Sequence, residues 1–409
     1  MTVCVLGLGY IGLPLALLLA DSGVSVVGFD VDERKLSELS NGNLPLIENG
    51  LEQLFSSVKN KKTFTVSDKV PLADAYIVAV PTPQTNHQSD LSYVLKSLEY
   101  IQPNYKKNSL IILESTVGPS DCGKIIVPQL SKWNVPFRFA HCPERAVPGN
   151  TLKEMTTNDR VIGGVTKKDA QLAKKLYQHF VTGSISLTTP NQAATVKTME
   201  NTYRAVNIAL ANEFAKIAHE LKLDVWEAIE LANHHPRVHI HLPSIGVGGH
   251  CIPVDPWFFV GESKESKLIE TALQVNNQMP EYIAMQLKQL ILTHKLKNPV
   301  IGILGYTYKK NVDDVRETPV QTVIDQLLKS GTVLVNDPYI SQIKGQKTTD
   351  LKTVLSKSSM IVLATNHDQY ASIVFKQYPN VKIVFDAHNL FSTKNFKQSA
   401  AHYYSLGRV

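Results

Sequence analysis

A lone cysteine, Cys251, stands in the stretch GVGGHCIPVDPWFF, and an aspartate, Asp255, follows it four residues later. Glycine tolerates backbone angles that other residues refuse, and it leaves room for a molecule to approach. A thiol attacks carbon as the thiolate, so a nearby positive charge would activate it. The pattern predicts a nucleophilic Cys251, with Asp255 orienting a water molecule or a ring hydroxyl. An inert buried cysteine is the alternative.

A long helix is predicted from Gln192 to Leu221, and it is also a candidate dimer interface. Its polar residues Lys197, Asn201 and Arg204 share one face, about 100° around the helix from the apolar residues. That row is either a solvated helix side or a set of ligand contacts, and Lys197 is one possible source of positive charge for Cys251. The apolar residues form the expected core stripe, which consists of Val196, Met199, Tyr203, Val206, Leu210 and Ile217.

The chain begins with the order strand, glycine turn, helix, strand, in TVCVLG, GLGYIG, LPLALLLADSG and SVVGFD. Gly7, Gly9 and Gly12 form a GxGxxG pattern, which allows a tight turn, a bare backbone against a pyrophosphate and close packing of helix on strand. Asp30 ends the second strand, where an acid binds the ribose diol, so the pattern favours NAD over a 2′-phosphorylated cofactor. Lys35 either reaches that ribose or is solvated.

Three more predicted strands, in ADAYIVAV, SLIILE and VPFRFA, are each followed by a loop. Ligands of open parallel sheets bind beyond the carboxyl ends of the strands. Each loop residue alone is typical of a turn or a cap, but together they are candidates to line one crevice. They are Pro81, Thr82, Ser115, Thr116 and Glu144.

Short apolar strands resume in the last third, in NPVIGILG, TVLVND, MIVLAT and KIVFDAHN. Gly302 and Gly305 do not complete a GxGxxG, which favours a different phosphate-bearing ligand over a second dinucleotide. The segment YKKNVDDVRETP is either a charged hinge or a place where Lys310 and Arg316 bind anions. The predicted fold class is α/β, with two Rossmann-like doubly wound parallel-sheet domains (1–187 and 296–409) joined by a central helical domain (188–295) that carries the cysteine loop.

The motifs together resemble one family, the nucleotide-sugar 6-dehydrogenases of the UDP-glucose/GDP-mannose dehydrogenase type. The matching motifs appear in family order: GLGYIGLP, FDVD, VPTP, EST, PER, the helix with Lys197 and Asn201, GVGGHCIPVDP and YKKNVDDVRETP. The resemblance implies oxidation of a sugar C6 alcohol to a carboxylate with two NAD⁺, through a thiohemiacetal and a thioester on Cys251. It also implies that the amino-terminal domain binds NAD and the carboxyl-terminal domain binds the UDP portion.

The resemblance further implies roles for individual residues. Lys197 and Asn201 would stabilise the oxyanion, Asp255 would assist proton transfer, Glu144 would act in thioester hydrolysis, and Thr116 would hold the catalytic water. The implied cofactor contacts are Gly7, Gly9, Tyr10, Ile11, Gly12, Asp30, Lys35, Pro81, Thr82, Ser115, Thr116 and Arg316. The implied substrate contacts are Glu144, Arg145, Lys197, Asn201, Arg204, Arg237 (reaching the sugar nucleotide, in a neighbouring subunit's site or its own), His239, Gly246, Gly248, Gly249 and Lys310.

The GGHC motif followed by VDPWF resembles the branch of the family that oxidises UDP-N-acetyl-D-mannosamine for cell-surface polysaccharides. UDP-glucose enzymes usually carry GGSC followed by a KD pair, and UDP-N-acetylglucosamine or UDP-glucose are the alternative substrates. Ser244 and Ile245 replace the Gly and Pro that many relatives carry before this motif, which leaves the approach of the loop to the diphosphate open.

Composition narrows the classes of function. The net charge is +6, from 42 basic and 36 acidic residues that are scattered along the chain, so nucleic acid is not an expected partner. The four cysteines form no CxxC pair and suggest free thiols in a reducing cytoplasm. The apolar stretch Val3 to Ala20 contains three glycines and a proline, which argues against a membrane span.

Two functions of another class are alternatives to dehydrogenase activity. A zinc site in the histidine-rich segment from His234 to Cys251 would place His239 and His241 on one strand face, but the spacing fits no closed structural zinc motif, so no metal is expected. A non-catalytic nucleotide-sugar sensor would be expected to lack Cys251 or Lys197, and both are present.

Overall fold

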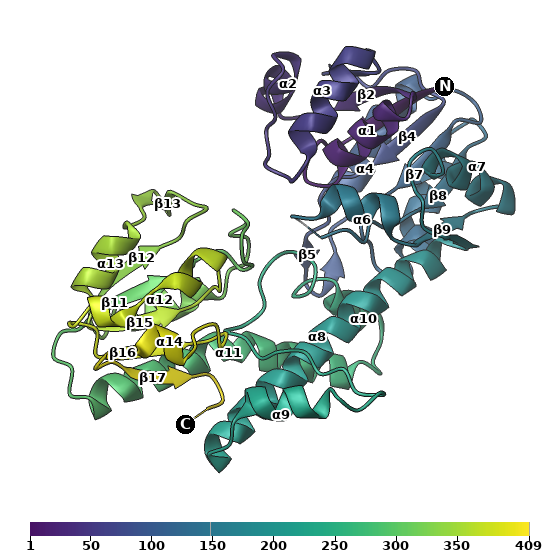
Figure 1. The fold of residues 1–409 in the computed structure, drawn as a ribbon. Helices are drawn as coiled ribbons and strands as arrows, with labels where there is room; N and C mark the ends of the chain where they lie inside the picture. The colour runs from purple at the N-terminus through teal and green to yellow at the C-terminus, as the bar shows by residue number, and fades with distance from the viewer. Residues whose placement is uncertain (148, 409) are drawn as a thin grey trace. The chain divides into compact units, whose positions relative to one another are not determined.

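The computed structural model describes residues 1–147 and 149–408 of the chain. The chain divides into two compact bodies: an amino-terminal body, residues 1–200 with 257–265, and a carboxyl-terminal body, residues 201–256 with 266–409. Each body contains one sheet with helices packed against it (Figure 1). The division into three functional domains stays a prediction.

The amino-terminal body is built on a sheet with the strand order β10-β9-β8-β7-β4-β1-β2-β3. The paired strands run parallel except β8 and β9, which are antiparallel. Its strands are β1 (Thr2–Leu6), β2 (Ser25–Phe29), β3 (Phe64–Ser67), β4 (Ala75–Val78), β7 (Leu110–Leu113), β8 (Arg138–His141), β9 (Arg160–Gly164) and β10 (Ile185–Thr188), and a small hairpin pairs β5 (Gln84–Thr85) with β6 (Gln88–Ser89). Its helices are α1 (Gly12–Asp21), α2 (Glu33–Ser40), α3 (Leu51–Lys61), α4 (Ser92–Ile101), α5 (Val127–Ser131), α6 (Thr151–Thr157) and α7 (Lys167–Tyr177).

Strand β1 shows why both faces of this sheet are covered. Val3 and Val5 point into one hydrophobic cluster, whereas Cys4 and Leu6 point into another. Successive side chains of a strand point to opposite faces, so an unbroken apolar strand requires helices on both. The expected apolar stretch from Val3 to Ala20 is therefore β1, the glycine turn and most of α1. None of the helices within residues 1–147 and 149–408 is long and apolar enough to cross a membrane.

The carboxyl-terminal body contains a parallel sheet with the order β12-β11-β15-β16-β17. These strands are β11 (Val300–Leu304), β12 (Thr332–Asn336), β15 (Met360–Leu363), β16 (Ile383–Asp386) and β17 (His402–Ser405), and a hairpin pairs β13 (Gln342–Ile343) with β14 (Gln346–Lys347). The helices are α9 (Val225–Ala232), α11 (Lys267–Thr293), α12 (Val320–Leu327), α13 (Leu351–Lys357) and α14 (Thr393–Phe396). Two helices contribute residues to both bodies: α8 (Pro190–Leu221) and α10 (Pro256–Glu262). The predicted fold class, two Rossmann-like sheets joined by long helices, is confirmed.

The expected core stripe of α8 is wrong. Met199 and Tyr203 are 55% and 58% exposed, and Leu210 and Ile217 are exposed as well. The buried positions are instead polar or small: Ala193, Ala194, Lys197, Thr198, Asn201, Thr202, Ala205, Ala209, Ala211, Asn212, Ala215 and Ala218. Alanines allow close approach of neighbouring elements, and the buried amides are satisfied, since Asn212 Nδ2 donates to Asn276 Oδ1 at 2.9 Å. The predicted polar row at Lys197 and Asn201 is therefore interior, and Arg204 alone of the three is exposed.

The first sheet positions an acid next to its glycine turn. Gly7 follows β1 with a φ of 92°, and its N–H donates to the Phe29 carbonyl at 2.9 Å. The next N–H, of Leu8, donates to Asp30 Oδ2 at 2.8 Å. A Cβ on Gly7 would lie 2.5 Å from the Ala79 carbonyl oxygen, so both the angle and the space demand glycine.

The second sheet repeats this construction with one difference. Gly305 follows β11 with a φ of 88°, and the N–H of Tyr306 donates to Asp337 Oδ2 at 2.7 Å. His367 Nε2 lies 3.1 Å from the same oxygen, and the side chains of Asp337 and His367 are both 0% exposed. The acid at this strand end is therefore covered by a buried histidine, whereas the side chain beside Asp30 is the partly exposed Lys35, at 3.3 Å.

Candidate active site

The structure separates Cys251 from the other thiols. All four cysteines are thiols outside any disulfide, and Cys251 is exposed while Cys4, Cys122 and Cys142 are buried. Burial raises the pKa of the Cys4 and Cys142 thiols to about 12, and it raises the pKa of Cys122 too. These three stay protonated at neutral pH, so Cys251 is the described thiol that is available for chemistry.

A tight turn connects Cys251 to Asp255, and Asp255 to helix α8. The Cys251 carbonyl accepts the N–H of Asp255 at 2.9 Å. The carboxylate of Asp255 accepts a hydrogen bond from Asn201 Nδ2 at 2.6 Å, and both side chains are buried. The structure therefore brings together two predicted catalytic residues that lie 54 positions apart in the sequence.

Lys197 lies one helical turn before Asn201 on α8, and only 8% of it is exposed. A lysine in that position points to the same side of the helix as Asn201. Lys197 belongs to the amino-terminal body and Cys251 to the carboxyl-terminal body, so their joint action stays a prediction.

The glycines of the cysteine loop have a packing role that the sequence did not reveal. A Cβ on Gly248 would lie 2.5 Å from Tyr308 Cβ, and one on Gly249 would lie 2.8 Å from Tyr308 Cζ. A Cβ on Gly246 would lie 2.8 Å from Pro319 Cβ. These glycines let the loop lie directly against the segment from Tyr308 to Pro319, and close approach of a substrate stays a prediction.

The segment from Tyr308 to Pro319 also fixes Arg316 near the loop. The Arg316 carbonyl accepts the N–H of Gly249 at 2.9 Å, and its guanidinium binds both Asp314 oxygens at 2.8 and 2.5 Å. Burial would raise the pKa of Asp314, but the bonds to Arg316 hold it below its usual value. Lys310 Nζ is more exposed and lies 3.3 Å from Asp368 Oδ1. Both cations are available to anions only in competition with an acid.

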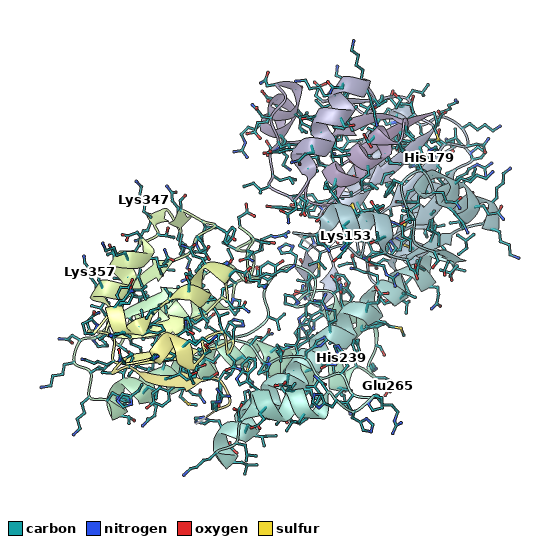
Figure 2. The ribbon with its side chains drawn as sticks, in the orientation of Figure 1. Lys153, His179, His239, Glu265, Lys347 and Lys357 are labelled. Carbon is teal, nitrogen blue, oxygen red and sulfur yellow. The ribbon has the colours of Figure 1, made fainter. Side chains whose placement is uncertain are left out.

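The residues between Ala232 and Gly246 correct another expectation. The segment with Arg237, His239 and His241 is irregular and forms no strand, and the side chains of Arg237 and His239 are exposed. His239 is labelled in Figure 2. The amide of Asn207 fixes it instead, donating to the His239 carbonyl and accepting the N–H of His241, each at 2.8 Å. Across the part of the chain that the structure describes, no three His, Cys, Asp or Glu side chains are grouped to hold a metal ion, which leaves the zinc alternative without a ligand set.

Ser244 and Ile245, the replaced residues before the glycines, anchor this loop. The Ser244 N–H donates to Asn212 Oδ1 at 2.8 Å, and its hydroxyl donates to the Gly246 carbonyl at 2.9 Å. Ile245 is 3% exposed and belongs to the hydrophobic core of the carboxyl-terminal body. Local bonds therefore replace the rigidity of the proline.

The glycine turn of the amino-terminal body suits a dinucleotide. A Cβ on Gly12 would lie 1.8 Å from the Gly7 carbonyl oxygen, whereas a Cβ on Gly9 would meet nothing within 4 Å. Gly12 therefore serves the packing of α1, and the space beside Gly9 is open for a ligand. Tyr10 and Ile11 complete the turn before α1 begins.

The loops after β4 and β7 are tied to one another. The Ser115 hydroxyl donates to the Val80 carbonyl at 2.6 Å, and the Thr82 hydroxyl donates to the Thr116 carbonyl at 2.5 Å. Pro81 lies between these bonds and is exposed. The structure gives Ser115 and Thr82 a role in joining the loops, and their contacts with a cofactor stay a prediction.

Glu144 is a buried carboxylate with many donors. Its Oε1 accepts the N–H groups of Arg145 and Ala146 at 2.6 and 2.8 Å, and its Oε2 lies 2.7 Å from Arg160 Nη2. Burial would raise its pKa, but Arg160 and these N–H groups hold the pKa below its usual value. The predicted substrate contact Arg145 is turned to Glu200, with Nε 3.0 Å from Oε2.

Sequence reasoning missed Arg160 and its second partner, Glu114. Both are buried, and Arg160 Nη1 lies 3.4 Å from Glu114 Oε1. The available signal was a charged residue directly adjoining an apolar strand: Glu114 follows β7, and Arg160 begins β9. A charge placed there is buried and must be paired.

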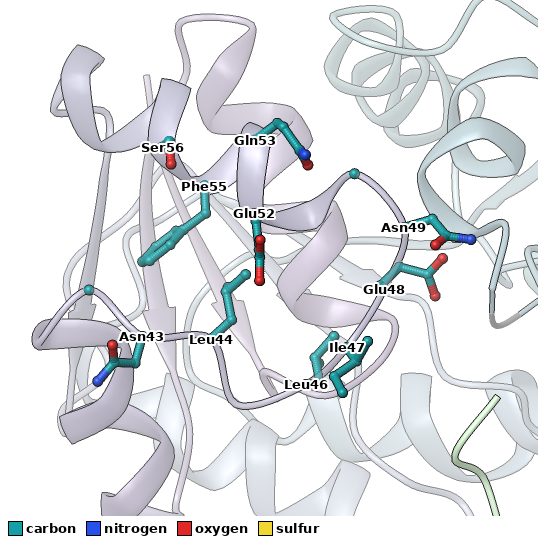
Figure 3. A pocket seen from close by; sticks show the side chains of 12 residues that line it. Asn43, Leu44, Leu46, Ile47, Glu48, Asn49, Glu52, Gln53, Phe55 and Ser56 are labelled. Atoms are coloured by element: carbon teal, nitrogen blue, oxygen red, sulfur yellow. The ribbon is translucent and has the colours of Figure 1, made fainter. Parts of the chain in front are cut away.

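One cavity of about 660 Å³ lies elsewhere in the amino-terminal body, along the loop between α2 and α3 (Figure 3). It contains none of the residues that the sequence indicated. Its acid, Glu48, accepts hydrogen bonds from Gly149 N, Thr151 N and Thr151 Oγ1 at 2.9, 3.1 and 2.8 Å, so this carboxylate fastens the chain and is not free for a ligand.

A glycine turn with an open side, an acid at the end of β2 and an exposed thiol on a second nucleotide-binding fold define a dinucleotide-dependent oxidoreductase. The chain belongs to the UDP-glucose/GDP-mannose dehydrogenase family: residues 1–181 match its NAD binding domain, 191–278 its central domain and 302–393 its UDP binding domain. It is therefore an NAD-dependent oxidoreductase of UDP-sugars.

Three relatives show how close the similarity is. The chain is 43% identical to the UDP-N-acetyl-D-mannosamine dehydrogenase of Methanococcus maripaludis strain S2, covering 97% of this chain and 95% of that one. It is 38% identical to an NDP-N-acetyl-D-galactosaminuronic acid dehydrogenase of Ralstonia nicotianae, over 96% and 97% of the two chains. The solved UDP-D-ManNAc dehydrogenase of Pyrococcus horikoshii superposes with a TM-score of 0.93 at 37% identity, over 100% of this chain and 99% of that one.

Proposed function

We propose that this enzyme oxidises the C6 alcohol of UDP-N-acetyl-D-mannosamine to UDP-N-acetyl-D-mannosaminuronate and so supplies precursors of cell-surface polysaccharides. The motif GGHC followed by VDPWF and the names of the relatives support this substrate. UDP-N-acetylglucosamine and UDP-glucose are the alternatives. The roles that the sequence assigned to the cofactor and substrate contacts are part of the proposal.

The proposed chemistry removes four electrons in two steps. NAD⁺, held at the glycine turn of Gly7, Gly9 and Gly12, would supply the hydride acceptor for each oxidation. The first oxidation converts the alcohol to an aldehyde with loss of a proton, and the Cys251 thiolate adds to that aldehyde as a thiohemiacetal. The second oxidation gives a thioester, and water then releases the carboxylate and the thiol. Covalent attachment keeps the aldehyde from escaping between the two oxidations.

Other residues of the chain serve these steps. Lys197 and Asn201 donate hydrogen bonds to the oxyanion, which is worth several kcal/mol where water is excluded. Asp255 orients Asn201 and assists proton transfer. Glu144 acts on the water that hydrolyses the thioester, and Thr116 holds it. The observation that carries the proposal is the 2.6 Å bond between Asn201 and Asp255, one turn from the exposed thiol.

Substrate trials with NADH absorbance test the proposal. Each UDP-sugar is incubated with NAD⁺, and two NADH per acid are expected with UDP-N-acetyl-D-mannosamine. Turnover of UDP-glucose without turnover of UDP-N-acetyl-D-mannosamine would contradict the proposed substrate. The variant Cys251→Ser should form no acid while still binding both ligands, and Cys4→Ala is the matched control because Cys4 is buried in the core. If Cys251→Ser produced as much acid as wild type, the mechanism would not pass through a thioester on Cys251.

We also propose a homodimer formed through α8. Tyr203, Leu210, Phe214 and Ile217 are exposed on this helix, and an apolar cavity of about 290 Å³ lies beside Phe214 and Ile217. Large apolar side chains that share a helix face need a partner surface. Light scattering should show a dimer that Ile217→Glu converts to a monomer, whereas Leu292→Glu, at an exposed position on α11, leaves it intact. A dimeric Ile217→Glu would contradict this interface.

The remaining proposals concern organisation. Residues 1–187 form the NAD-binding domain, 188–295 the central domain with the cysteine loop and 296–409 the UDP-sugar-binding domain. The four cysteines form no disulfide, which supports a reducing compartment, so we place the enzyme in the cytoplasm. Limited proteolysis tests this division into domains. NAD⁺ should protect residues 1–187 from cleavage, and UDP should protect residues 296–409.

A further inference from the structure

Arg160 lies between two buried carboxylates in the amino-terminal body. Its Nη2 is 2.7 Å from Glu144 Oε2, and its Nη1 is 3.4 Å from Glu114 Oε1. Glu114 follows β7, Glu144 follows β8 and Arg160 begins β9, so three neighbouring strands bring these side chains together. The guanidinium lies 4.7 Å from the ring centre of Tyr177, which closes the cluster on one side.

The two carboxylates have unequal partners. Glu144 receives two backbone N–H groups in addition to the short bond from Arg160. Glu114 receives the Tyr177 hydroxyl and the longer contact from Arg160, both at Oε1. Its Oε2 is buried and has no hydrogen-bond partner among the described residues. A buried anionic oxygen without a donor is far more costly than a neutral acid in the same place.

Among the described residues, Arg160 is the cation in contact with both acids, and Lys197 forms an ion pair with neither. The groups that act on Glu114 are Arg160 and Lys197, which are positive, Glu144, which is negative, and Tyr177 and Cys142; burial raises the pKa of Tyr177 well above its usual value and the pKa of Cys142 to about 12. Burial raises the pKa of the Glu114 carboxyl to about 8, and Glu144 adds to this while Arg160 opposes it. When two buried acids share one cation, the acid with fewer donors takes the proton.

We propose that Glu114 carries a proton in the working enzyme and thereby leaves Arg160 to hold Glu144 as the anion that acts in thioester hydrolysis. Glu114 is then a positioning residue, because its side chain is 0% exposed and acts through Arg160. Loss of its proton would set a second negative charge against the same guanidinium and loosen Glu144. The role of Glu144 rests on the proposed function, but the protonation of Glu114 does not.

Thermal unfolding against pH tests the protonation without substrate. The folded chain binds the Glu114 proton more tightly than the unfolded chain, so raising the pH from about 4.5 to about 8 lowers the stability of the wild type. Glu114→Gln places an amide where the protonated acid stands and removes this dependence. Its melting temperature relative to wild type should therefore rise between pH 5 and pH 8, an interval chosen to span about these values.

Glu48→Gln is the matched control. Glu48 is also buried, but its two carboxyl oxygens together accept three hydrogen bonds. Its melting temperature should fall below wild type, with no rise toward alkaline pH. A constant difference between Glu114→Gln and wild type across the pH range would overturn the proposal. Should Glu114→Gln fail to fold, Glu114→Met, which is also uncharged, serves for the same comparison.

The pH profile of acid formation tests the positioning role. The ratio of kcat for Glu114→Gln to kcat for wild type should increase above pH 7, because only the wild type can gain the second negative charge. A flat ratio would overturn the positioning role even where the stability trend is found. Failure of the enzyme to oxidise any UDP-sugar would instead overturn the proposed function and leave the stability test of Glu114 standing.

Discussion

The hydrogen bond between Asn201 and Asp255 predicts that these two residues act as a unit. The bond joins a carboxylate to an amide at 2.6 Å, with both side chains 4% exposed. A buried hydrogen bond to a charged group is worth about 1.5–3 kcal/mol, which corresponds to about 10- to 150-fold in rate or equilibrium. If Asp255 orients Asn201 toward the oxyanion, either substitution removes the hydrogen bond. Asn201→Ala and Asp255→Ala should then each lose this free energy, and each should also lose the catalytic effect of the residue that remains.

The double variant should therefore be little worse than the poorer single variant. We expect a coupling energy of about 1.5–3 kcal/mol in a double-mutant cycle built from kcat of acid formation. The assay is NADH production at saturating NAD⁺ and UDP-sugar, with a thermal melt of each variant to remove losses due to unfolding. Effects of the two substitutions that simply add would refute the reasoning, because additivity means that Asp255 does not act through Asn201.

The remaining predictions concern the glycine turn, the thiols and the cysteine loop. Gly9→Ala should keep the melting temperature of wild type, because the added Cβ meets no protein atom, but calorimetry should show a loss of NAD⁺ affinity. Gly7→Ala should instead lower the free energy of unfolding by about 1–3 kcal/mol or more, because Gly7 has a positive φ and the added Cβ would lie 2.5 Å from a carbonyl oxygen. Iodoacetamide at neutral pH should label Cys251 before any other cysteine, as peptide mass spectrometry would show, and equal labelling of Cys142 would contradict its burial. Gly248→Ala should slow that labelling or the turnover by displacing the loop from Tyr308, and an unchanged rate would argue against the packing role.

The fold was largely predictable because its signals are local. An apolar strand, a glycine turn and a helix in immediate succession have few solutions, and β1, α1 and β2 follow the expected segments closely. Four strands of the last third, β11, β12, β15 and β16, were found in the same way, whereas β17 and the short β13–β14 hairpin were not predicted. The α8 stripe was not, because a hydrophobicity pattern ranks Met199 and Tyr203 above alanine and cannot show that small residues and satisfied amides fill the interior.

The site was predictable by residue type but not by partnership. Nothing in the spacing of Asn201 and Asp255 shows that their side chains meet, because that contact depends on how the turn after Cys251 folds back on α8. Arg160 and Glu114 were overlooked for a similar reason. Each reads as the polar end of a strand, and only the adjacency of β7, β8 and β9 turns them into one electrostatic cluster with Glu144.

The histidine that covers Asp337 affects how many cofactors can be present at once. Two related nucleotide folds raise the question whether the chain holds two dinucleotides, one for each hydride. In the second fold the corresponding acid, Asp337, contacts His367 and accepts the N–H of Tyr306. Its side chain is 0% exposed, so it is not accessible to a ribose. In the proposed reaction both molecules of NAD⁺ would therefore use the site beside Gly9 in succession, so the first NADH would leave while the intermediate stays bound to Cys251.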